Sequence, residues 1–184
     1  MKRTLGRIIL GIAVLVVLAA TFFSYTPSNE SDESYAVYSS FLEQDRTGDS
    51  HALGDPQGLV LILDHTSTGM FRILVPRFEI AYPASSKLDM ALRNLFSRRL
   101  SRQFHLRGSY LLIPSTDTST LTEAQLRSSY GVMRFSKVTF RNQDTEAFFY
   151  QEHLCGMCGY GSFVHMAKEN GTWRVIDQDS TWIS

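Results

Sequence analysis

The last fifty residues of the chain constrain its fold most, because they hold four short β-rich segments separated by turn signals. The dipeptide Asn170-Gly171, between the last two segments, is the strongest short-range signal for a β-hairpin. The four segments are residues 135–140, 147–153, 162–168 and 173–177. The sequence therefore predicts an antiparallel β-meander of three or four strands at the C-terminal end.

Apolar residues recur at helical spacing in two stretches ahead of this meander. The first covers residues 35–42, and Ser31, Asp32 or Ser34 is expected to cap it. The second and longer stretch covers residues 88–104. Its apolar stripe consists of Leu88, Ala91, Leu92, Leu95, Phe96 and Leu100. An apolar face of this kind buries itself against a sheet.

Further strands are predicted at residues 59–64, 71–75 and 110–113, and a short helix with Thr120 or Thr122 as its cap is predicted at residues 120–128. Helices ahead of an antiparallel meander indicate the α+β class. We expect an N-terminal helix and one long amphipathic helix packed on an antiparallel sheet that ends in the C-terminal β-meander.

The N-terminus carries an apolar run of 16 residues, 8–23, behind Lys2, Arg3 and Arg7. This length lies at the border between a signal peptide and a signal anchor, and Val17-Leu18-Ala19 is an acceptable cleavage site. The sequence predicts membrane attachment through residues 5–23. The expected location is a single-pass inner-membrane protein with a periplasmic or extracellular domain, or a secreted protein after cleavage. Residues 24–34 are expected to be a polar linker and residues 35–184 a single domain.

Composition narrows the classes of function. The chain is 43% hydrophobic and 20% charged, which is typical of a globular protein. Its net charge is zero, but without the three leading cations 15 basic and 18 acidic residues remain. A mildly acidic body gives no electrostatic reason to bind nucleic acid, which requires clustered cations.

The two cysteines, Cys155 and Cys158, stand in C-x-x-C spacing within a glycine-rich segment. The sequence favours a local disulfide, with Gly156, Gly159 and Gly161 allowing a tight turn. Three alternatives stay open: a redox-active dithiol, a pair of inert thiols, and a zinc site. The zinc site would be completed by His153 and His165. No cofactor and no metal are predicted.

One further pair of residues suggests chemistry. Asp64 and His65 follow the apolar segment 59–64, and the ends of strands often hold functional groups. Neighbours on a strand point to opposite faces, so we interpret the pair as a polar turn. No G-x-S-x-G, Walker or H-E-x-x-H motif is present, and no catalytic residue is assigned.

Several C-terminal motifs together resemble a group of uncharacterised bacterial exported proteins. The matching residues are Ser136, Val138 and Phe140, the segment 155–161 around the cysteines, and Lys168, Gly171, Trp173 and Val175. The resemblance implies a small extracytoplasmic protein and transfers no catalytic residue.

These observations favour a non-catalytic envelope domain that binds a partner or a small ligand. The alternative is an envelope thiol-disulfide redox protein that uses Cys155 and Cys158. A third hypothesis is a hydrolase-like domain with Asp64 and His65 beside a pocket.

Overall fold

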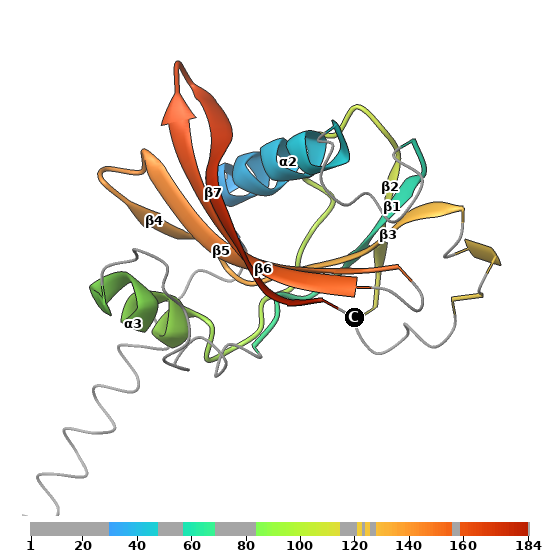
Figure 1. Ribbon diagram of the computed structural model, residues 1–184, viewed down its shortest axis with the longest axis horizontal. Helices are drawn as coiled ribbons and strands as arrows, with labels where there is room; N and C mark the ends of the chain where they lie inside the picture. Colours follow the sequence, from blue (N-terminus) through green and yellow to red (C-terminus); the bar gives the residue numbers. More distant parts are fainter. Residues whose placement is uncertain are drawn as a thin grey trace, which may run out of the picture.

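A computed structural model describes residues 30–47, 57–68, 84–114, 121–122, 124–125, 128–155 and 159–183 (Figure 1). Within these residues a mixed β-sheet of seven strands is accompanied by two helices. In chain order the elements are α2 (Asp32–Thr47), β1 (Leu59–Leu63), α3 (Ala84–Arg93), β2 (Tyr110–Ile113), β3 (Ser129–Phe135), β4 (Thr139–Arg141), β5 (Glu146–Leu154), β6 (Gly159–Glu169) and β7 (Thr172–Ile183).

The sheet combines a parallel and an antiparallel part. Its strand order is β2-β1-β3-β5-β6-β7, and β4 pairs with β5 beside this path. Strand β1 runs parallel to both β2 and β3, whereas the pairs from β3 through β7 are antiparallel. The prediction of a wholly antiparallel sheet is therefore wrong. The sequence predicts strands at the positions of β1 and β2, but no local pattern reveals whether such strands pair parallel or antiparallel.

The predicted long amphipathic helix at residues 88–104 is also wrong. Helix α3 ends at Arg93, and Leu95 and Phe96 beyond it are about half exposed. The chain then pairs with the segment after β1: Leu100 N–H donates to Asp64 O at 2.7 Å, and Thr66 N–H donates to Arg98 O at 2.8 Å. Backbone groups of residues 98–100 are thus hydrogen-bonded to the segment that follows β1, and not to a continued helix. With two short helices beside a mixed sheet, the described part is mostly β, and the predicted α+β arrangement is not found.

Helix α2 confirms the predicted N-terminal helix and lies in the curve of the sheet (Figure 1). Ser31 caps it, because the Ser34 N–H donates to Ser31 Oγ at 3.2 Å. Tyr38 stacks on Phe135 with ring centroids 4.7 Å apart, and its hydroxyl donates to Ser136 O at 2.7 Å. Both groups are buried, so this hydrogen bond fixes the rotation and depth of the helix on the sheet.

The C-terminal meander is confirmed. Strands β4, β5, β6 and β7 are successive antiparallel neighbours. Asn170 (φ 51°) and Gly171 (φ 80°) form the two-residue turn between β6 and β7, as the Asn-Gly signal predicts. Ser136 bridges the gap between β3 and β4, because its N–H donates to Tyr150 O and its Oγ accepts from Tyr150 N, both at 2.8 Å.

Two glycines of the cysteine segment have a different role from the one predicted. Gly159 and Gly161 lie inside β6, and neither has a positive φ. A Cβ atom at Gly161 would overlap Trp182 Nε1 and the Tyr150 hydroxyl, and one at Gly159 would lie 3.1 Å from the indole. Trp182 Nε1 donates to Tyr150 Oη at 2.8 Å. Because the two glycines have no side chains, the backbone there is flat enough for the Trp182 ring to lie against it.

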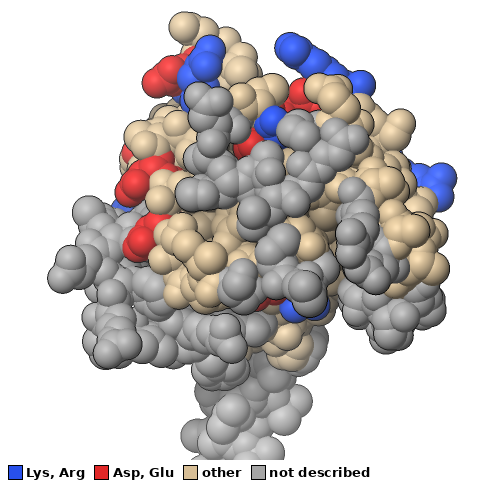
Figure 2. Space-filling model, turned by 45° about the vertical axis from the view of Figure 1, so that its right-hand side comes forward, with Lys and Arg blue, Asp and Glu red and all other residues tan. Residues whose placement is uncertain are grey.

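Several predictions concern residues outside the described part, namely the membrane segment at residues 5–23 and the strand at residues 71–75. Among the described residues, no helix has the length and apolar character needed to cross a membrane. The predicted membrane attachment and single-pass location are thus not supported by the described part of the structure. Figure 2 shows the charged side chains of the described residues scattered over the visible face, with acidic and basic groups interspersed.

The Trp182 arrangement predicts the effect of Gly161→Ala. The added methyl group would displace the indole or the Tyr150 hydroxyl, so the free energy of unfolding should fall by about 1–3 kcal/mol. Urea unfolding followed by tryptophan fluorescence measures this. In a Trp182→Ala background the same change should cost clearly less. Equal costs in both backgrounds would show that overlap with Trp182 is not the cause.

Candidate functional site

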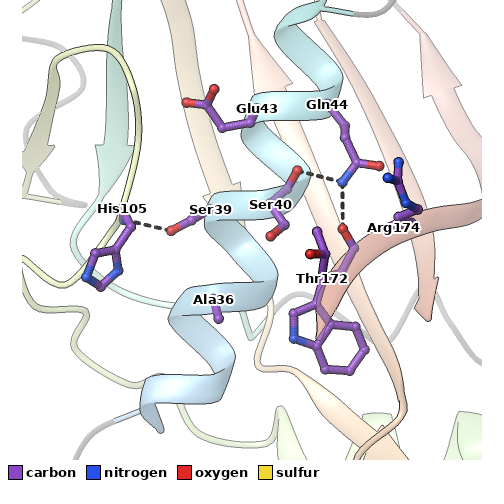
Figure 3. A pocket seen from close by; sticks show the side chains of 9 residues that line it. Ala36, Ser39, Ser40, Glu43, Gln44, His105, Thr172 and Arg174 are labelled. Atoms are coloured by element: carbon purple, nitrogen blue, oxygen red, sulfur yellow. Dashed lines mark hydrogen bonds between the residues drawn. The ribbon is translucent and has the colours of Figure 1, made fainter. Parts of the chain in front are cut away.

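An open groove lies over the outer face of α2 (Figure 3). It has a volume of about 360 Å³, within the range of small-molecule sites. Its lining residues are Ala36, Ser39, Ser40, Glu43, Gln44, His105, Thr172, Trp173 and Arg174. Ala36 lies three and four positions before Ser39 and Ser40, so these three small residues share one face of the helix. They form the shallow floor of the groove.

One wall of the groove is the segment that follows Phe104, which is bonded to α2. The His105 N–H donates to Ser39 Oγ at 2.9 Å, and the Arg107 N–H donates to Glu43 Oε1 at 2.8 Å. Arg107 Nε lies 3.8 Å from the second oxygen of Glu43. The wall is thus held by side chains of the helix, and the imidazole of His105 is exposed beside the floor (Figure 3).

The opposite wall is the beginning of β7, which the amide of Gln44 ties to the helix. Its Nε2 donates to Trp173 O at 3.0 Å, and its Oε1 accepts from Val175 N at 3.1 Å. Behind this wall, Glu33 Oε1 accepts from Trp173 Nε1 at 2.6 Å and from Lys168 Nζ at 2.7 Å. The hydrogen bond from Lys168 lowers the pKa of Glu33.

The two walls carry opposite charges. Glu43 lies on the side of His105, whereas Arg174 lies on the side of Thr172 (Figure 3). The Arg174 side chain is 63% exposed, and its Nε is 3.6 Å from Glu169 Oε2. Such an exposed pair is weak, so the guanidinium remains available to a ligand. Sequence reasoning missed this groove. Its one local signal was the run of small residues on the predicted helix.

A second polar region lies under the C-terminal end of α2. The hydroxyls of Tyr130 and Tyr160 both donate to the carboxylate of Asp45, at 2.6 Å and 3.1 Å. Burial, followed by the charge of Asp45, raises the pKa of both tyrosines. Both hydroxyls therefore stay protonated and act as donors to Asp45.

The candidate residue His153 belongs to this second region and is completely buried. Its Nε2 is 2.7 Å from Tyr130 O, which makes Nε2 the protonated nitrogen and Nδ1 a bare acceptor. Its ring stacks on Tyr130 at 4.7 Å. Burial lowers the pKa of His153, although Asp45 opposes this effect. Gly131 (φ 124°) passes so close that any side chain there would overlap the imidazole.

The two histidines of the alternative zinc site, His153 and His165, do not come together. His153 pairs with Tyr160, whereas His165 pairs with Phe148, which lies five residues earlier in β5 than His153. This separates the two histidines by about 17 Å, at roughly 3.4 Å per residue. The ring of His165 stacks on Phe148 at 4.2 Å, on the sheet face opposite to that of His153. Among the described residues, no three His, Cys, Asp or Glu side chains are grouped so as to hold a metal ion.

Cys155 follows β5, is half-buried and is disulfide-bonded. Cys158, the chain's other cysteine, lies outside the described residues. A bonded Cys155 offers no thiolate to a metal. It also lies at the end of a strand rather than at a helix N-terminus, the setting that activates a thiol.

Asp64 and His65, interpreted from the sequence as a polar turn, follow directly after β1 and are hydrogen-bonded to each other. His65 Nδ1 is 2.7 Å from Asp64 Oδ1, and Arg99 Nε is 3.9 Å from the other carboxylate oxygen. Strand alternation does not separate the two side chains, because β1 ends at Leu63. Asp64 lies in a bend beyond the strand, and His65 forms an isolated antiparallel β-bridge with Arg99. The pair orients an imidazole, but no serine or cysteine of the described residues is hydrogen-bonded to it. The hydrolase hypothesis therefore lacks a nucleophile in this part of the chain.

Comparisons with known proteins give no assignment. No family model matches the chain, and no curated protein or solved structure matches it significantly. The resemblance to exported bacterial proteins stays a prediction.

The burial of His153 predicts a pH dependence of stability. Its pKa in the folded state lies below the ordinary value of 6.5, so below about pH 6.5 the unfolded chain binds a proton that the folded chain does not. The free energy of unfolding should fall as the pH drops from 7 toward 5, by up to about 1.4 kcal/mol per pH unit for this proton.

Urea midpoints at a series of pH values check this for the wild type, for His153→Gln and for His105→Gln as an exposed control. The His153→Gln variant should show a shallower decline than both. Parallel pH profiles for the three proteins would contradict the explanation.

Proposed function

We propose that this chain is a non-catalytic domain that binds a small zwitterionic molecule in the groove over α2. The observation that carries the proposal is the placement of Glu43 and Arg174 on opposite walls of a groove about 360 Å³ in volume. Charges fixed on opposite sides of one site match a ligand that carries both signs.

The groove offers a partner to each part of such a ligand. The Glu43 carboxylate accepts one short hydrogen bond, from Arg107 N, and keeps accepting capacity for an ammonium group. The exposed Arg174 guanidinium suits a carboxylate, to which it can donate two parallel hydrogen bonds. Thr172 and Ser40 add hydroxyl groups between the two charges.

Binding without catalysis agrees better with the groups that line the groove. The Ser39 hydroxyl is already an acceptor for His105 N, at 2.9 Å. The imidazole of His105 is hydrogen-bonded to no carboxylate or hydroxyl of the described residues. A nucleophile and a base in contact, which acyl or phosphoryl transfer requires, are therefore not found among the lining residues.

The proposal is tested by titrating the full chain with glycine, L-leucine and L-glutamate, followed by the amide resonances of Ser40, Thr172 and Arg174. We expect saturable shifts at these positions. Ser40→Leu places a bulky side chain on the floor and should weaken binding by at least about tenfold, or about 1.4 kcal/mol. Glu43→Gln and Arg174→Gln should each weaken it as well.

Thr47→Leu is the matched control, because Thr47 is exposed on the same helix and does not line the groove. It should bind as the wild type does. Absence of saturable shifts with all three amino acids, or equal affinity in Ser40→Leu, would disprove the proposal.

A further inference from the structure

Two side chains of β5 share an unusual property on the face that α2 covers. Gln151 and His153 lie two residues apart, so they point to the same face of the sheet, and both are completely buried. Within the part of the chain that the structure describes, neither His153 Nδ1 nor Gln151 Oε1 has a hydrogen-bond partner. A buried acceptor without a donor is energetically unfavourable, so two of them on one strand point to a donor that binds there.

The neighbouring donors are already engaged. The Tyr130 and Tyr160 hydroxyls donate to Asp45. The ring N–H of His153 faces Tyr130 O at 2.7 Å.

The amide groups beside them are engaged too. Gln151 Nε2 donates to Ser162 Oγ at 2.7 Å, and Gln178 Nε2 donates to the same oxygen at 2.8 Å. The atoms of Gln151 and His153 that remain unbonded among the described residues, Oε1 and Nδ1, are therefore both hydrogen-bond acceptors.

Asp45 places a carboxylate at this position. Burial and then the charge of Asp45 raise the pKa of both tyrosines, and the same charge opposes the lowering of the His153 pKa by burial. Arg46, the next residue of α2, lies over the ring of Tyr130 at 5.8 Å from its centre. Its position shows that the aromatic rings here accept a cation on their faces.

We propose that Gln151, His153 and Asp45 form a binding site for an ammonium group, either the ammonium ion or the head of a small primary amine. An ammonium group carries only donors and a positive charge, so it complements two bare acceptors beside a carboxylate. An anion would be repelled by Asp45. This site involves none of the groove residues and does not depend on the proposed function.

The probe is methylammonium chloride, added to the full chain labelled with ¹⁵N-histidine at pH 8, where the imidazole is neutral. We expect a saturable shift of the His153 Nδ1 resonance toward the hydrogen-bonded range, together with a higher melting temperature. Tetramethylammonium chloride at equal ionic strength has the charge without an N–H donor and should cause neither change.

Two variants locate the effect. Gln151→Met keeps a similar volume but removes the free acceptor, so the affinity for methylammonium should fall about tenfold. Gln178→Met is the matched control, since Gln178 bonds to the same serine but has no part in the site, and its affinity should be unchanged.

The wild-type comparison of the two salts decides the question even if a variant fails to fold. An Nδ1 resonance that is already hydrogen-bonded in amine-free buffer and does not respond to methylammonium would identify an internal water instead and overturn the proposal. An equal response to both salts would overturn it as well. Binding that survives Ser40→Leu separates this site from the groove.

Discussion

The placement of α2 in the curve of the sheet is the constraint on which the remaining structure depends. Tyr38 provides it, because its ring stacks on Phe135 and meets Phe149 edge-on at 5.6 Å, while its hydroxyl satisfies Ser136 O. That carbonyl belongs to the short gap between β3 and β4. The aromatic packing buries apolar surface between helix and sheet, and the single hydrogen bond selects one rotation of the helix.

Once α2 has this rotation, four consecutive residues near its end contact different parts of the structure. Glu43 bonds to the segment at Arg107, and Gln44 bonds to β7 on the other side. Asp45 accepts hydrogen bonds from the two tyrosines on the sheet, and Arg46 lies over one of their rings. Consecutive residues on a helix point about 100° apart, so one turn reaches every neighbour. The groove and the proposed ammonium site therefore lie on two sides of the same helix end.

Two glycines near the cysteines, Gly159 and Gly161, are explained by contacts within the antiparallel part of the sheet. They were expected to serve the turn, but they lie inside β6 under the ring of Trp182. A similar exclusion occurs at Gly131, where the backbone approaches His153. In each case an aromatic ring occupies the space that a side chain would fill. The repeated pattern indicates that close contact between ring and backbone, more than turn geometry, accounts for these glycines.

The sequence by itself determined the local elements: the helix with its Ser31 cap, the β6–β7 hairpin and the antiparallel meander. These depend on side-chain period and turn chemistry within a few residues, which the order of amino acids contains directly. Only the tertiary structure decided the parallel pairing of β1 with β2 and β3, the end of α3 at Arg93, and the contact between Asp64 and His65. It also decided both candidate sites. Each candidate site joins residues from separate elements, such as Ser40 with Arg174 or Asp45 with Tyr160, and such proximity arises from long-range packing that no local pattern records.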